Sequence, residues 1–152
     1  MSELSQSGIS VDVPNGWEAS IAGGESTASS AGPTQETVLH LGSFPLPPLR
    51  GSFGAGAVES MGPANVMVIL FEYGSESANT PLFASQGIPR QLDPKLFDRD
   101  ALQHGVPGQS GLQHFFTQNG RAFCLYVVLG SHIDRVELVE KVNAVLETLE
   151  IE

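Results

Sequence analysis

The stretch Gly111–Gly130, GLQHFFTQNGRAFCLYVVLG, decides how the C-terminal half of this chain is built. Two apolar runs flank the pair Asn119-Gly120. An Asn-Gly pair in this setting is a strong signal for a type I′ hairpin turn, because that turn needs positive φ at both central residues. The stretch therefore predicts a strand, a tight turn and a second strand. A two-residue turn pairs Gln118 with Arg121 and sets the register of the whole hairpin.

In this register both faces of the hairpin carry large apolar side chains, and each buried Leu or Phe contributes roughly 1.5–3 kcal/mol. Each face therefore needs a cover. One face carries Leu112, His114, Phe116, Phe123, Leu125, Val127 and Leu129, and the other carries Gln113, Phe115, Thr117, Ala122, Cys124, Tyr126 and Val128.

The segment after the hairpin predicts the first cover, an amphipathic helix over about residues 132–148. Its apolar positions recur every three or four residues, at Val136, Val139, Val142, Val145, Leu146 and Leu149. Ser131 can cap its start, and Glu137, Lys141 and Glu147 fall on the exposed side. We expect the second cover to be residues 82–105, where Asp93-Pro94 predicts the start of a further helix and Gly105 its end.

Alternating apolar residues predict more strands upstream. Residues 9–13 and 17–21 alternate on either side of the turn Pro14-Asn15-Gly16, and a third strand is expected over Thr37–Phe44. Val66–Tyr73 is apolar on both faces, as is typical of a central strand. We therefore predict a single α+β domain over residues 1–152, with a mostly antiparallel sheet flanked by helices. Residues 1–7 are expected to be a disordered tail, and residues 23–35 and 45–63 long loops.

Composition excludes several function classes. The 152 residues include 17 acidic and 7 basic ones, a formal charge of −10. This balance argues against a nucleic-acid partner, which selects a basic face, and against an anionic membrane surface. Apolar runs such as Val66–Phe71 are too short to span a bilayer. The polar N-terminus does not look like a signal peptide, and the lone Cys124 excludes an intramolecular disulfide. We expect a soluble, cytoplasmic protein.

The order of these elements resembles the Mog1/PsbP-like fold family. The likeness lies in the strand and turn of GISVDVPNGW, where Pro14-Asn15-Gly16-Trp17 matches the family's P-x-G-W turn, and in the C-terminal hairpin and helix. It covers mainly Ile9–Ile21 and Gly111–Ile151. The resemblance implies an antiparallel sheet flanked by helices and an adaptor, assembly factor or uncharacterised bacterial protein. It implies no catalytic residue.

The motifs that could carry chemistry each have a simpler explanation. The glycines of Gly51–Gly56 lack the Lys-Ser/Thr of a phosphate loop. The four histidines show no metal-ligand spacing, and Cys124 has the setting of a small core residue. Ser110 lacks the second glycine of a nucleophile elbow at the required position. We expect no metal and no cofactor.

Glu72 ends the apolar run on the face of Val68 and Leu70, where a carboxylate must reach water or a partner. It is expected to pair with Arg121 or Arg90, and the alternative is that it lines a pocket. Burial among apolar groups would lower the pKa of His114. Glu72, His114 and Arg121 are therefore the candidate ligand-binding residues.

A second candidate surface comes from the apolar residues Phe44, Pro47, Pro48, Leu49 and Phe53. They form either an exposed patch for a partner or a lid folded over the sheet, and the two readings weigh equally. The leading hypothesis is a non-catalytic protein-interaction or assembly module, which binds a partner protein or a second copy of itself. The alternative is a small-molecule-binding or enzymatic domain with a pocket under residues 45–62.

Overall fold

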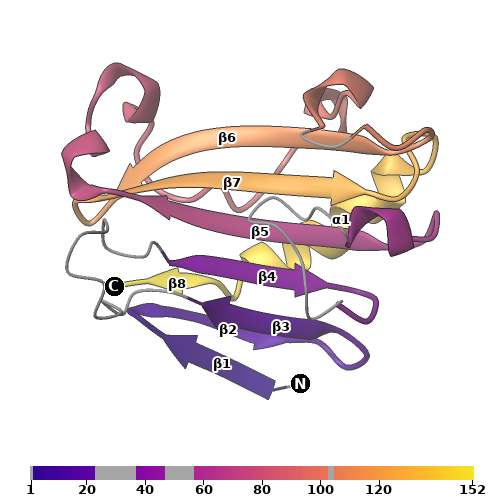
Figure 1. Cartoon of the computed structure of the whole chain (residues 1–152), viewed down its shortest axis with the longest axis horizontal. Helices are drawn as coiled ribbons and strands as arrows, with labels where there is room; N and C mark the ends of the chain where they lie inside the picture. The colour runs from indigo at the N-terminus through magenta and orange to yellow at the C-terminus, as the bar shows by residue number, and fades with distance from the viewer. Residues whose placement is uncertain (1, 23–36, 47–56, 103–104) are drawn as a thin grey trace, which may run out of the picture.

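The computed structural model describes residues 2–22, 37–46, 57–102 and 105–152 of the chain. Its strands form two antiparallel sheets, one of three strands in the order β1-β2-β8 and one of five in the order β3-β4-β5-β7-β6 (Figure 1). The strands are β1 (Ser2–Gln6), β2 (Ile9–Val13), β3 (Glu18–Ala22), β4 (Val38–Gly42), β5 (Val66–Tyr73), β6 (Ser110–Gln118), β7 (Arg121–Leu129) and β8 (Glu150–Ile151). With the helix α1 (Arg135–Leu146) packed on a sheet, the predicted α+β class is confirmed.

The hairpin of β6 and β7 has the predicted register. Gln118 pairs with Arg121 and Phe116 pairs with Phe123. Asn119 and Gly120 have φ of 53° and 74°, as a type I′ turn requires. β5 lies between β4 and β7 in the larger sheet, which confirms its predicted central place.

The helix α1 is shorter than the predicted range of 132–148 and is turned slightly on its axis. Val139, Val142 and Leu146 are buried, as expected, but Val136 is 61% exposed and Leu138 is buried in its place. The hydroxyl of Ser131 accepts a hydrogen bond from the N–H of Asp134, which precedes the helix. Within the described ranges, no helix is long and apolar enough to cross a membrane.

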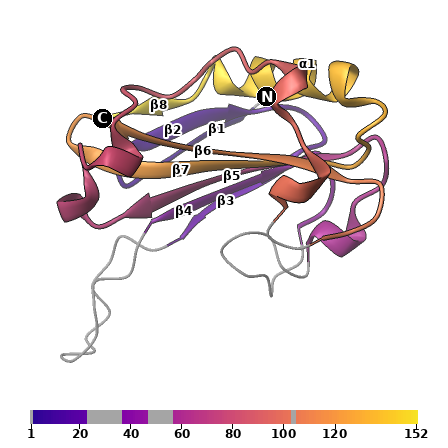
Figure 2. The ribbon, with the colours of Figure 1, turned by 90° about the horizontal axis from the view of Figure 1, so that it is seen from above.

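One face of the five-stranded sheet packs against both α1 and the three-stranded sheet. Figure 2 shows α1, β1, β2 and β8 on the same side of the larger sheet. Ile9 and Val11 from β2 join Ile151 from β8 and the inner side chains of α1 in one apolar core. Residues 88–97 also contribute to this core, through Ile88, Leu92 and Phe97.

The opposite face of the five-stranded sheet has its own apolar cluster, built on Met67, Ile69, Tyr126 and Val128. The prediction that residues 82–105 cover this face is only partly right, because Ile88, Leu92 and Phe97 join the core on the face of α1 instead. Within the described chain, the residues packed on the opposite face from outside the sheet include Phe44, Leu46, Ala57, Val58, Met61, Phe83, Leu102 and Val106. Val58 opens a short 3₁₀ turn, η1 (Val58–Ser60), inside the stretch 45–63 that was expected to be a loop. The loop expected at 23–35 lies outside the described residues.

The prediction of a disordered tail at residues 1–7 is wrong, because residues 2–6 form β1 and pair along their whole length with β2. Ser7 and Gly8 have φ of 55° and 78°, which makes a second tight turn with positive φ at both central residues. Leu4 packs against the main core. Pairing with β2, together with one packed apolar side chain, therefore accompanies the order of an otherwise polar strand.

The helix predicted from Asp93 to Gly105 is also wrong. Asp93 does cap a helical turn, since its carboxylate accepts from the N–H of Lys95 at 2.9 Å, but this turn is the short 3₁₀ helix η4 (Pro94–Leu96). A second one, η5 (Arg99–Ala101), follows. Asp98 lies between them in extended conformation and forms a β-bridge with Gly111, which interrupts the helix.

Candidate functional site

The strand β6 is an edge strand of the five-stranded sheet, and other parts of the chain cover its two ends. At one end, Gly111 exchanges two backbone hydrogen bonds of 2.9 Å with Asp98. At the other end, Thr117 donates to Ser85 and accepts from Gly87, both at 2.8 Å. These bonds show that the backbone N–H and C=O groups of Gly111 and Thr117 point away from β7.

Between these two ends, no described residue pairs with the edge. Backbone groups along an antiparallel strand point alternately to one side and the other, so Gln113 and Phe115 point outward like Gly111 and Thr117. No backbone hydrogen bond between described residues uses the outward N–H and C=O groups of Gln113 and Phe115. We call these two residues the open edge of β6.

The open edge exists because residues 88–97 leave the plane of the sheet. Pro89 and Pro94 lack the N–H that a paired strand needs, and the chain between them binds α1 instead. Leu92 and Asn143 exchange hydrogen bonds of 2.8 and 3.2 Å through the amide side chain. Arg90 donates to the carbonyl of Leu146 at 2.7 Å. These bonds fix residues 89–96 as a wall that stands beside β6.

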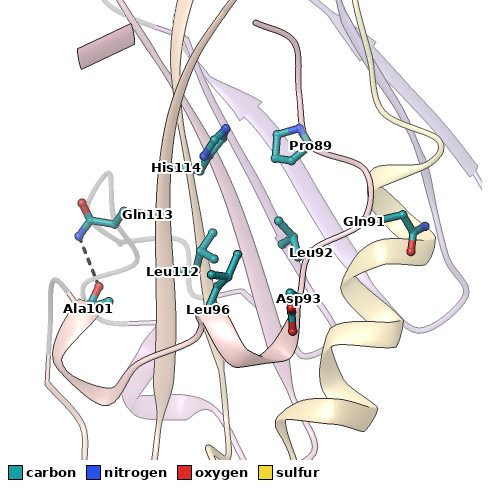
Figure 3. Close-up of a pocket in the computed structure, with 9 residues that line it drawn as sticks. All are labelled: Pro89, Gln91, Leu92, Asp93, Leu96, Ala101, Leu112, Gln113 and His114. Atoms are coloured by element: carbon teal, nitrogen blue, oxygen red, sulfur yellow. Dashed lines mark hydrogen bonds between the residues drawn. The ribbon is translucent and has the colours of Figure 1, made fainter. Parts of the chain in front are cut away.

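A cavity of about 440 Å³ lies between this wall and β6 (Figure 3). Its volume is within the range typical of ligand sites, and its apolar lining is concentrated in leucines from both sides. The lining residues are Pro89, Gln91, Leu92, Asp93, Leu96, Ala101, Leu112, Gln113 and His114. The open edge and the cavity are therefore adjacent, and Gln113 belongs to both.

His114 is the one predicted ligand-binding residue that lines this cavity. Its ring stacks on that of Phe116, with 6.0 Å between the ring centroids, and burial lowers the pKa of His114 from its ordinary value. The neighbouring Gln113 turns its side chain to the other face and donates to the carbonyl of Ala101 at 3.4 Å. Because its pKa is lowered, the imidazole of His114 is an uncharged polar group at neutral pH, on a mostly apolar wall.

The other two predicted ligand-binding residues form an ion pair with each other. Arg121 donates from Nε and Nη2 to the two carboxylate oxygens of Glu72, at 2.9 and 2.8 Å. The same guanidinium donates to the carbonyls of Ser7 and Glu152. The hydrogen bonds to Glu72 raise the pKa of Arg121. This arrangement joins the large sheet to the turn after β1 and to the end of the chain, and neither residue lines the cavity beside His114.

The predicted apolar interaction surface can be traced for one of its residues. Phe44 is 5% exposed and packs in the apolar cluster on the face of the sheet opposite α1. This position agrees with the alternative of a lid folded over the sheet rather than an exposed patch. Pro47, Pro48, Leu49 and Phe53 lie outside the described residues, and so does most of the segment above the pocket predicted under residues 45–62. The role of this segment stays a prediction.

Ser110 and His132 are a further pair with possible chemistry, since Ser110 Oγ lies 2.8 Å from His132 Nδ1. Ser110 is fully buried, however, so no substrate reaches its hydroxyl in this conformation. Cys124 is buried in mid-strand as predicted, and burial raises the pKa of its thiol to about 11. Among the residues described, no group of three or more His, Cys, Asp or Glu side chains could hold a metal ion.

The open edge and the wall of the cavity were not predicted from the sequence. The prolines at 89 and 94 were the available signal, because they forbid continuous pairing of this segment with a sheet edge. Comparisons with protein-family models, with curated proteins and with solved structures find no match to this chain. The resemblance to the Mog1/PsbP-like fold therefore stays a prediction.

Proposed function

We propose that this protein is a non-catalytic interaction module that binds an extended segment of a partner protein along the open edge of β6. The observation that carries the proposal is the pair Gln113 and Phe115, whose outward backbone groups have no backbone partner among the described residues. An extended peptide presents alternating N–H and C=O groups and can add to such an edge as a further strand.

The adjacent cavity supports the same conclusion. In strand addition, backbone hydrogen bonds contribute affinity, and pockets for alternate side chains contribute specificity. The cavity lies beside the open edge and is lined by Leu92, Leu96 and Leu112. Hydrogen bonds between Leu92 and Asn143 fix its wall before any ligand arrives, which lowers the ordering cost of binding.

The alternative function is a small-molecule-binding or enzymatic domain. The size of the cavity and the presence of His114 in its wall favour this candidate. A small apolar molecule would fill the cavity, but it would leave the backbone groups of Gln113 and Phe115 to water. A peptide uses both features, so it is the ligand that we favour. We also propose that the protein is cytoplasmic and that it binds neither nucleic acid nor membranes.

The substitution Gln113→Pro tests the proposal. It removes an N–H that points away from β7, so the hydrogen bonds between β6 and β7 remain. Gln113→Val is the matched control, because it also loses the side-chain bond to Ala101 but keeps the N–H. Random heptapeptides displayed on phage are selected on the folded wild-type protein, and the affinity of each selected peptide for the three proteins is then measured by fluorescence anisotropy.

We expect the selected peptides to bind wild type and Gln113→Val alike and to bind Gln113→Pro at least tenfold more weakly. A library that yields no binder, or binders that ignore Gln113→Pro, would contradict the proposal. Thermal unfolding shows whether each variant is folded. If Gln113→Pro is unfolded, peptides with single N-methylated amides make the same test from the ligand side, and at least one methylation must then abolish binding.

A further inference from the structure

We infer that the segment bound at the open edge runs antiparallel to β6 and carries, from its N-terminus to its C-terminus, a large apolar residue, an aliphatic residue and a polar residue. This inference rests on the proposed function and specifies its ligand. It follows from the length of the open edge, from the faces of its side chains and from the groups that surround them.

The length of the open edge limits what can bind. Asp98 covers the edge beside Gly111, and Ser85 and Gly87 cover it beside Thr117. Gly111 and Thr117 are about 20 Å apart along an extended strand, which leaves room for about three or four residues of a bound peptide. A second copy of β6 would extend into positions that the chain itself occupies. The geometry therefore favours a short segment that bends away from the sheet at both ends.

The face of each side chain sets the pattern. In an antiparallel addition, peptide residues hydrogen-bond with Gln113 and Phe115, and the residue between them lies opposite His114. Side chains of opposed residues share a face, so this middle residue points to the side of Leu112 and His114, where the cavity lies. A leucine-sized side chain fits its apolar wall, whereas a charged one would lose its hydration without a partner.

The residues on either side of the middle one point to the opposite face of the sheet. The residue on its N-terminal side lies opposite Phe115, whose ring is 5.4 Å from that of Phe83 and 6.3 Å from that of Tyr73. An aromatic or large aliphatic side chain extends this ring cluster. The residue on its C-terminal side lies opposite the exposed amide of Gln113, which suits a polar side chain.

The antiparallel direction follows from hydrogen-bond geometry. Antiparallel bonds run perpendicular to the strands and are slightly more stable per residue than the slanted bonds of a parallel pair. The two pairings that flank the open edge do not decide the direction, because that of Asp98 with Gly111 is antiparallel and that of Gln86 with Thr117 is parallel. Direction is testable, because reversing the order of the peptide residues exchanges the neighbours of Phe115 and Gln113.

The test uses a fluorescein-labelled peptide with the central sequence Phe-Leu-Asn between Gly-Ser flanks, measured by fluorescence anisotropy on the whole chain. Replacing its leucine by aspartate is expected to weaken binding at least tenfold, and the reversed order Asn-Leu-Phe at least fivefold. On the protein, Leu96→Gln changes an exposed side chain that lines the cavity and is expected to weaken binding at least threefold. Val136→Gln is the matched control, since Val136 is equally exposed but is not a lining residue, and it should have no effect.

The outcomes separate this inference from the proposed function. If peptides from the library are sensitive to Gln113→Pro, but the reversed or aspartate peptide binds as tightly as Phe-Leu-Asn, the inference is overturned and the proposed function stands. The same holds if Phe-Leu-Asn fails to bind while other peptides remain sensitive to Gln113→Pro. If no peptide is sensitive to Gln113→Pro, both are overturned.

Discussion

The ion pair of Arg121 with Glu72 offers the sharpest prediction about stability. Both side chains are only 20% exposed, and the pair is joined by two hydrogen bonds of 2.8 and 2.9 Å. The substitution Arg121→Met keeps the apolar stem but leaves the mostly buried carboxylate of Glu72 without this partner. It also removes the donors to the carbonyls of Ser7 and Glu152.

The magnitude follows from the burial of the pair. Breaking a fully buried pair costs about 3–5 kcal/mol, and the remaining exposure places this one near the lower end, at about 3 kcal/mol. For a domain of this size, each kcal/mol lowers the melting temperature by about 2–4 °C, so a decrease of about 6–12 °C is expected. Glu150→Gln is the control, because Glu150 pairs with Arg90 at 3.7 Å and is 68% exposed. An exposed pair contributes less than about 1 kcal/mol.

The assay is chemical denaturation of wild type, Arg121→Met, Glu72→Gln, the double variant and Glu150→Gln. The double-mutant cycle isolates the coupling between Arg121 and Glu72. If Arg121→Met costs no more than Glu150→Gln, the joining role given to Arg121 is wrong. Peptide binding should survive both Arg121→Met and Glu72→Gln, because neither residue lines the cavity.

Three further predictions concern the turn, the thiol and a histidine. Gly120→Val is expected to lower the free energy of unfolding by about 1–2 kcal/mol, because a side chain at φ of 74° is strained. The control Gly105→Val should lower it much less, because a Cβ there meets open space and φ is not positive. Equal melting temperatures of the two variants would refute the type I′ turn. Cys124, with its pKa raised to about 11 by burial, should resist labelling by a disulfide reagent at pH 7.5 in the folded protein and react quickly in denaturant; fast labelling without denaturant would refute its burial. Burial lowers the pKa of His114 in the folded protein, so the unfolded chain binds more protons between that lowered pKa and about 6.5, and the free energy of unfolding decreases as the pH falls through this interval. Urea unfolding from pH 8 to pH 5 should show a smaller decrease for His114→Asn than for wild type, and equal decreases would refute the burial of His114.

The sequence predicted the C-terminal half of the fold well, because local chemistry determines it. An Asn-Gly turn fixes the register of β6 and β7, and every pair counted outward from it follows by alternation. The helix after the hairpin was predicted from its apolar spacing. Its face was predicted imperfectly, because Val136 fits the stripe by spacing but lies in the first turn of α1, where it is 61% exposed.

The sequence predicted the middle of the chain poorly, because tertiary pairing determines its conformation. Asp93 and Pro94 begin a helical turn as their chemistry dictates, but the bridge between Asp98 and Gly111 ends it. Such a bridge depends on which strand lies at the edge of the sheet. Strand β1 was missed for a similar reason, since its polar residues are ordered by pairing with β2 rather than by their own burial.

The candidate site was predicted only in part. The ion pair expected between Glu72 and either Arg121 or Arg90 forms with Arg121. Of the three residues predicted to bind a ligand, His114 lines the cavity, whereas Glu72 and Arg121 do not. The site itself depends on which backbone groups of β6 remain unpaired, and no single residue encodes that property. It results from the departure of residues 88–97 from the sheet, for which Pro89 and Pro94 were the visible signs.

Amide hydrogen exchange, measured residue by residue by NMR, tests the binding edge most directly. His114 bonds to β7 and serves as the internal reference, since neighbouring residues of an antiparallel strand point to opposite sides. We predict fast exchange at Gln113 and Phe115 and slow exchange at His114 in the free protein, and at least tenfold slower exchange at Gln113 and Phe115 when a selected peptide is bound. Protection of Gln113 and Phe115 equal to that of His114 in the free protein, or no change at saturating peptide, would contradict the proposal that β6 is a binding edge.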